Sequence, residues 1–169
     1  GAHQAGCAHV RENAMAAVPN KFPVVVTSNS GFPLDQSLYQ SVKGMSAAAR
    51  IAEDGGTIFI ASECSDGIPA HGNFGKELQR HKTLESVDAW LRGLASPALD
   101  QWQIQVLVQI LQRQRVCIYS SLDPDTVRSC QLTHVADLEA SLREHIETLG
   151  TGVPVAVLPE GPVTIPYVA

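Results

Sequence analysis

Four short apolar runs alternate with helix-like segments along this chain, and this alternation constrains the fold more than any other feature. The runs cover residues 22–27, 57–61, 116–119 and 153–158. They are rich in β-branched residues and nearly continuous, which is typical of strands buried on both faces. Strands that alternate with helices are joined by crossovers, which makes the sheet parallel. The pattern predicts a Rossmann-like three-layer α/β/α sandwich with a mostly parallel sheet of about four strands.

The best-defined helix is expected from Asp35, as N-cap, to Ala52. Leu38, Val42 and Met45 fall on one apolar stripe of this segment, and the glycines at 55 and 56 would end it. Further helices are expected over residues 2–17, 74–79, 86–94, 97–114 and 133–149, with a short one opening at residues 123–124.

Composition limits the possible partners. The net charge is −5 and the basic residues are scattered, which argues against nucleic acid or an anionic membrane. No stretch approaches the roughly 18 apolar residues of a membrane span, and no secretory leader is evident, so a cytoplasmic protein is expected. The four cysteines form no CxxC motif and are expected to be reduced.

Domain boundaries follow from the same reading. Residues 1–19 are expected to be a linker helix that leads from an N-terminal lobe, because the chain starts without Met in a segment that is already helical. Residues 20–160 form the α/β lobe, and residues 161–169 an extended tail that returns toward the N-terminal lobe.

A second, polar stripe on the helix after the first strand carries Tyr39, Gln40 and Lys43. Their i,i+3 and i,i+4 spacing lets a phenol, an amide and an ammonium converge. Such a set suits a small hydroxy acid, whose carboxylate the lysine would neutralise while the amide donates hydrogen bonds. Spacing alone, however, is more typical of a solvated helix face than of a site.

Other polar groups form no recognisable site. The loop at residues 28–31 lacks both the dinucleotide and the P-loop fingerprints. The spacing of Glu63, Asp66 and His71 fits no common metal pattern, and no metal site is predicted. No GxSxG motif surrounds the serines at 120 and 121, which argues against a hydrolase. Trp102, near the start of a helix, suits core or interface packing, or a wall for a flat cofactor.

Three stretches carry a family resemblance. They are residues 24–74, VVVTSNSGFPLDQSLYQSVKGMSAAARIAEDGGTIFIASECSDGIPAHGNF; residues 100–105, DQWQIQ; and the closing VAVLPEGP with IPY between residues 155 and 167. Together they closely resemble the C-terminal domain of the nickel-dependent lactate racemase family.

The resemblance implies one lobe of a two-lobed racemase or epimerase of small 2-hydroxy acids. Members carry a nickel pincer nucleotide on the N-terminal lobe, which also supplies the metal ligand and the acid–base histidines. None of those residues has a counterpart here, so this lobe alone should bind no cofactor, hold no catalytic residue and be inactive. Gln40 and Lys43 match the family's substrate-contacting amide and lysine, Tyr39 the adjoining tyrosine, and Trp102 a tryptophan near the cofactor.

Two alternatives stay open. A non-catalytic Rossmann-like binding or interaction module would share the fold, and a nicotinamide-dependent dehydrogenase would need a glycine-rich turn where this chain offers only Gly31. The sequence leaves several properties undecided: the identity of the hydroxy acid, the choice between racemisation and epimerisation, the lobe boundary and the oligomeric state.

Overall fold

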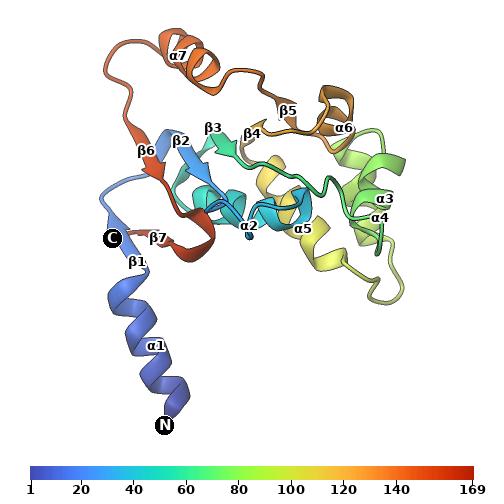
Figure 1. Ribbon diagram of the computed structural model, residues 1–169, viewed down its shortest axis with the longest axis horizontal. Coiled ribbons are helices and arrows are strands. Elements are labelled where there is room, and N and C mark those ends of the chain that lie inside the picture. Colours follow the sequence, from blue (N-terminus) through green and yellow to red (C-terminus); the bar gives the residue numbers. More distant parts are fainter.

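A five-stranded parallel sheet forms the centre of the computed structural model, which describes residues 1–169 (Figure 1). Its strands lie in the order β5-β4-β3-β2-β6. The bounds are β2 Phe22–Ser28, β3 Ala52–Ala61, β4 Arg115–Tyr119, β5 Thr133–His134 and β6 Val155–Leu158. Strands β3, β4 and β5 are therefore added in turn on one side of β2, and the chain then crosses back to add β6 on the other side of β2. The predicted sandwich and its parallel sheet are confirmed.

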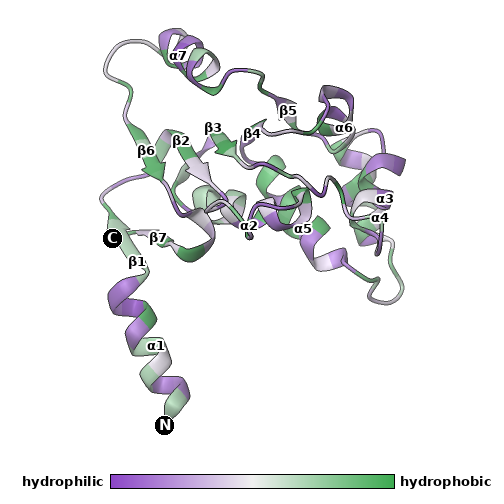
Figure 2. Ribbon diagram, viewed as in Figure 1, coloured by the Kyte–Doolittle hydropathy of each residue, from purple (hydrophilic) through white to green (hydrophobic).

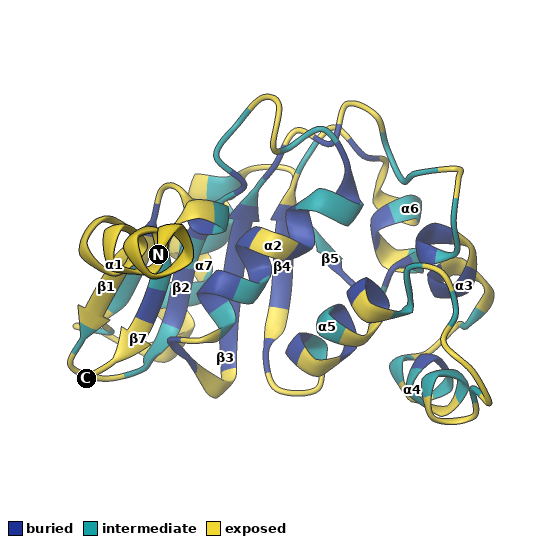
Figure 3. Cartoon of the chain, turned by 90° about the horizontal axis from the view of Figure 1, so that it is seen from below, coloured by how far each residue is buried: buried dark blue, intermediate teal, exposed yellow.

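Helices cover both faces of the sheet. One face carries α2 (Leu38–Ala49) and α5 (Gln101–Leu111), and the other carries α7 (Leu138–Leu149) (Figures 1 and 3). Three further helices lie toward the β5 edge: α3 (Phe74–Arg80) and α4 (Leu84–Arg92) beside α5, and α6 (Pro124–Ser129) beside β5.

Successive residues of the central strands point into two separate cores. Ile58 and Ile60 belong to the larger core beneath α2 and α5, whereas Phe59 packs in the smaller one beneath α7. All three side chains are buried. Burial on both faces explains why the middle residues of these strands are apolar, whereas polar residues such as Glu53 and Asp54 lie at the start of β3; Figure 2 colours part of β3 green and part purple.

Several predicted boundaries were wrong because local hydrogen bonds compete with helical periodicity. Ser37, not Asp35, caps α2, since its side chain accepts from the backbone N–H of Gln40. The Asp35 carboxylate instead accepts from the N–H of Glu63, 3.2 Å away. The helix ends at Ala49, and Gly55, at φ 81°, forms an irregularity inside β3 rather than a helix stop.

The predicted helix over residues 133–149 was also too long. Its first residues form β5, and α7 starts only after Asp137, whose side chain accepts from the N–H of Ala140. The helix expected over residues 97–114 is likewise shortened to α5. β5 has two residues, too few to produce a periodic signal in the sequence.

Two strands near the ends of the chain pair with each other, and the first helix extends away from them (Figure 1). This helix, α1, spans Ala2–Asn13 and buries no residue, so the expected helix over residues 2–17 was too long. Residues Met15–Val18 form β1, which pairs in parallel with β7, Ile165–Val168. A 3₁₀ turn, η1 (Gly161–Val163), precedes β7, so the last nine residues are not uniformly extended.

No helix is both long and apolar enough to cross a membrane. All four cysteines are free thiols, as the absence of paired spacing indicated.

A buried amide fixes α2 to the carboxyl end of β2. The side chain of Asn29 is fully buried; its oxygen accepts from the N–H of Gly44, 3.0 Å away, and its nitrogen donates to the Leu34 carbonyl. Gly161 crosses α2 at Gly44, where a β-carbon on Gly161 would lie 3.0 Å from the Gly44 Cα and 2.5 Å from the Thr27 hydroxyl oxygen. Both glycines are therefore required by close approach.

We expect Asn29→Ala to destabilise the chain by about 2 kcal/mol, because it removes both hydrogen bonds of a fully buried amide, to the Gly44 N–H and to the Leu34 carbonyl. Urea unfolding followed by circular dichroism measures the change. Asn20→Ala is the matched control, since Asn20 is exposed and its side chain makes no hydrogen bond. Equal unfolding midpoints for the two variants would contradict the role of Asn29.

Candidate functional site

The predicted residues lie on one face of α2, in unequal environments. Tyr39 and Gln40 are half-buried, and Lys43, one turn further along, is exposed. The Tyr39 ring packs edge-on against Phe74 and Trp102, with centroid distances of 5.3 Å and 5.9 Å. These contacts fix the direction of the phenol.

Helix α5 braces α2 at the same point. The side chain of Gln103 is almost completely buried, and its Nε2 donates to the backbone carbonyl of Tyr39 over 2.6 Å. A buried amide between two helices specifies their register, because any slip would leave its polar atoms unpaired. The helix that carries the candidate residues is therefore held on both sides, by Asn29 and by Gln103.

A cavity of about 540 Å³ lies beside the first turn of α2, and we call it the α2 cavity. Tyr39 and Gln40 line it, whereas Lys43 and Trp102 lie outside its lining. Residues of the loops that follow β2 and β3, together with Asp100 before α5, complete the wall. The full lining is Pro33, Gln36, Ser37, Tyr39, Gln40, Asp66, Pro69, Ala70, His71 and Asp100.

Asp100 is an acidic group at the edge of this cavity with an unusual backbone. It adopts φ 63°, in the left-handed region, and its carboxylate accepts from the N–H of Asn73 at 3.1 Å. Gly72 lies so close that a β-carbon there would be 1.8 Å from the carboxylate. Burial raises the pKa of the Tyr39 phenol, and the charge of Asp100 raises it further. The phenol is therefore protonated at neutral pH and can donate a hydrogen bond.

The point where the strand order reverses, between β2 and β6, is filled by the protein itself. Asn29 pairs with Glu160 as an antiparallel bridge, and the Ser28 hydroxyl donates to the Pro159 carbonyl. Ligands of open α/β sheets usually bind at this point. In this chain the α2 cavity lies away from that point, beside the loops that follow β2 and β3, and it offers more space than the point between β2 and β6.

Metal-binding side chains do not converge in this chain. No group of three or more His, Cys, Asp or Glu residues is placed to hold one ion. Asp66 and His71 line the α2 cavity, but Glu63 lines a different cavity of about 350 Å³ at the ends of β2, β3 and β4.

Comparison with known proteins identifies the domain. A family model described as the lactate racemase C-terminal domain matches residues 18–165. The chain belongs to this family.

The lactate racemases of Thermoanaerobacterium thermosaccharolyticum and Lactiplantibacillus plantarum are 36% and 31% identical to the chain over 165 and 166 residues. Each match covers 95% of this chain and 38% of the relative. This lactate racemase C-terminal domain therefore spans well under half the length of the curated relatives it matches.

Solved structures agree with the family assignment. The lactate racemase apoprotein from T. thermosaccharolyticum superposes with a TM-score of 0.85 at 34% identity, over 97% of this chain and 40% of that one. A protein from Thermotoga maritima shares the fold alone, with a TM-score of 0.64 at 9% identity over 99% of this chain and 42% of that one.

Sequence reasoning missed the residues that support the site. Gln103 and Asp100 lie within the DQWQIQ stretch of the domain, but only their hydrogen bonds reveal that they brace α2 and face Tyr39. The one available signal for Gln103 was a polar residue on the buried face of an otherwise apolar helix. No sequence signal marked Asp100.

We expect Asp100→Asn to lower the pKa of Tyr39 but to leave it above the ordinary value of about 10, because burial remains the larger cause. Asparagine tolerates the left-handed backbone, so the loop should keep its shape. The tyrosinate absorbance, titrated in a background with Tyr119→Phe and Tyr167→Phe, measures the change. An unchanged midpoint would contradict the contact between Asp100 and Tyr39.

Proposed function

We propose that this chain is the substrate-binding C-terminal lobe of a 2-hydroxy-acid racemase or epimerase of the lactate racemase type. The observation that carries the proposal is the grouping of Tyr39, Gln40 and Lys43 on one face of a doubly braced helix, beside the α2 cavity, in a domain of this family. The substrate would be a small 2-hydroxy acid bound through its carboxylate.

The three side chains divide the binding work. Lys43 forms no ion pair within the chain, so its ammonium is available to neutralise a carboxylate. Gln40 adds amide hydrogen bonds from the cavity wall, and the protonated phenol of Tyr39 can donate to the hydroxyl or carboxylate. Their roles are to bind and orient the substrate while charge shifts at its α-carbon.

The cofactor belongs to another part of the proposed enzyme. We infer that an N-terminal lobe would hold the nickel pincer nucleotide that the resemblance implies; in support, no three His, Cys, Asp or Glu side chains of this chain are placed to hold one ion. Trp102, whose side chain is 55% exposed beside Tyr39, is the residue we place near that cofactor.

We also propose that an N-terminal lobe of the same polypeptide covers this face, linked through residues 1–19 and 161–169. The paired strands β1 and β7 bring those two segments together. Phe32 and Leu99, exposed at 81% and 68%, add apolar surface that such a lobe would bury. The cytoplasmic location expected from the sequence stays a prediction.

The decisive test uses the full-length enzyme, loaded with its cofactor, and single enantiomers of 2-hydroxy acids. Wild type should abolish optical rotation as the two isomers equilibrate. Lys43→Ala should lose well over tenfold in kcat/KM, since about 1.4 kcal/mol of lost transition-state stabilisation already costs a factor of ten.

Lys82→Ala is the matched control, because Lys82 is also exposed but lies between α3 and α4, outside the lining of the α2 cavity. Full activity in Lys43→Ala would exclude the proposed role of Lys43. Failure of the loaded wild type to interconvert any 2-hydroxy acid would instead favour a binding module without catalysis.

A further inference from the structure

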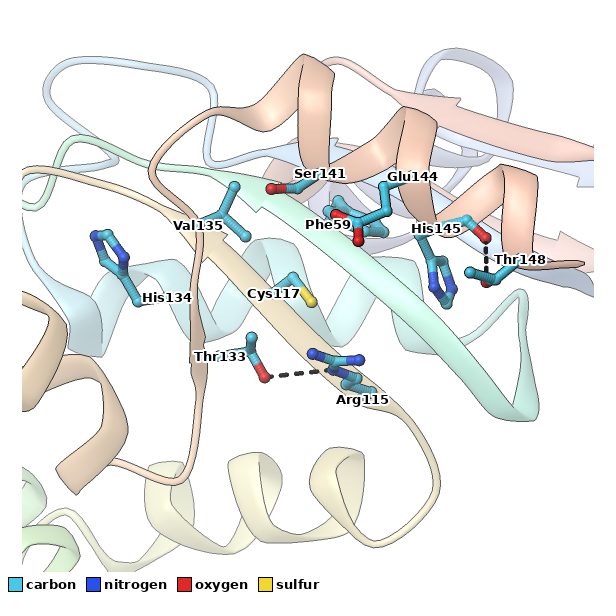
Figure 4. Close-up of a pocket in the computed structure, with 10 residues that line it drawn as sticks. All are labelled: Phe59, Arg115, Cys117, Thr133, His134, Val135, Ser141, Glu144, His145 and Thr148. Carbon is cyan, nitrogen blue, oxygen red and sulfur yellow. Dashed lines mark hydrogen bonds between the residues drawn. The ribbon is translucent and has the colours of Figure 1, made fainter.

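A further cavity lies on the opposite face of the sheet from α2, under α7 (Figure 4). We call it the α7 cavity; its volume is about 490 Å³. Its lining is Phe59, Arg115, Cys117, Thr133, His134, Val135, Ser141, Glu144, His145 and Thr148. Arg115 and Thr133 are the first residues of two parallel strands, so this cavity reaches the amino-end edge of the sheet. The α2 cavity follows the carboxyl ends, and the two sites share no residue.

Arg115 is a cation in this cavity that forms no ion pair. Its Nε donates to the Thr133 hydroxyl over 3.4 Å, and no carboxylate lies within 4.0 Å of its guanidinium. Arg113, two residues earlier, provides a contrast because two hydrogen bonds, of 2.9 Å and 2.7 Å, join it to Asp54. Thr133 thus orients Arg115; the guanidinium also lies beside the Cys117 thiol, whose pKa is raised by burial and lowered to a smaller extent by the guanidinium charge, and no acidic group pairs with it.

The floor of the cavity is apolar and one wall is an imidazole. Phe59, Cys117 and Val135 form the floor and are almost completely buried. The ring of His145 lies tilted against Phe59, with centroids 5.6 Å apart, and Figure 4 shows it extending into the same space as Arg115. Burial lowers the pKa of His145, and the Arg115 charge lowers it further. The imidazole is therefore neutral at pH 7.

We propose that the α7 cavity binds a small organic monocarboxylate, with Arg115 gripping the carboxylate and the apolar floor supporting the rest of the molecule. A planar guanidinium matches a carboxylate with two parallel hydrogen bonds. Orientation by Thr133 reduces the ordering that binding must impose. The volume falls within the range of small-molecule sites, roughly 300–1,000 Å³.

The other charged and titratable groups define the ligand's charge. Glu144 is the only carboxylate in the lining, and His134 and His145 are the only imidazoles. Arg115 is the only arginine or lysine in the lining, so it can neutralise one carboxylate; a second anionic group, as in a phosphate or dicarboxylate, would face Glu144 without a cation of its own.

The test titrates benzoate and its neutral analogue benzamide into the full-length protein, labelled with ¹³C at the histidine rings. We expect saturable benzoate binding with a Kd on the order of 1 mM, seen at His145, and at least tenfold weaker binding of benzamide. Bound benzoate should also raise the pKa of His145, because the anion offsets the charge of Arg115. Equal binding of the two compounds would overturn the proposal.

Two arginine variants test whether benzoate binds in the α7 cavity. Arg115→Gln should weaken benzoate binding at least tenfold and raise the pKa of His145 in the free protein, whereas Arg113→Gln, the matched control, should change neither. Equal effects of the two substitutions would overturn the role of Arg115. His71 lines the α2 cavity and distinguishes the two sites. Benzoate shifts confined to His71 would exclude the α7 cavity, and the comparison of benzoate with benzamide in wild type needs no variant to fold.

Discussion

The position of α2 depends on one buried side chain. Asn29 directly follows β2, accepts from the N–H of Gly44 inside the helix and donates to the Leu34 carbonyl in the turn, so one amide links the end of the strand, the turn and the helix. Burying an amide is unfavourable unless its polar atoms are paired, which makes any other placement of the helix costly. Gly161 then crosses at Gly44, within one turn of Lys43, with room for no larger residue. The proposed substrate-binding face is thus fixed before any ligand arrives.

A second constraint acts from the opposite side of the same helix. Gln103 binds the carbonyl of Tyr39, and the Tyr39 ring lies between Phe74 and Trp102. Asn29 fixes the middle of α2 and Gln103 fixes its first turn, so the helix can neither slide nor rotate without breaking a buried hydrogen bond. Groups that orient a substrate need this kind of rigid support, because a displacement of about 1 Å can cost a hundredfold in rate.

The sequence predicted the elements whose signal is periodic and local. Continuous apolar runs identified four strands, and helical spacing placed Tyr39, Gln40 and Lys43 on one face. It missed pairings between distant segments, such as β1 with β7, which depend on contacts between residues 15 and 165. The predicted cap, Asp35, was wrong because Asp and Ser both cap helices. The structure favours Ser37, since the Asp35 carboxylate accepts from the N–H of Glu63 instead. The sequence also did not reveal that Gln103 and Asp100 support the site, because their contacts join segments that are far apart in the chain.

The charged residues around the α2 cavity would determine which way the proposed substrate points. Asp66 and Asp100 are part of its wall, whereas Lys43 lies on the same helix face as Gln40 but beyond the lining. Two carboxylates repel the carboxylate of a bound hydroxy acid, and the lysine attracts it, so both effects point that group toward the Lys43 end of the helix face. The remainder of the substrate would then extend past Gln40 toward the two acids, which accept hydrogen bonds from hydroxyl groups but disfavour a second acidic group. The two acids in the wall and the lysine beyond it, and not the shape of the cavity alone, would therefore set the orientation of a bound hydroxy acid.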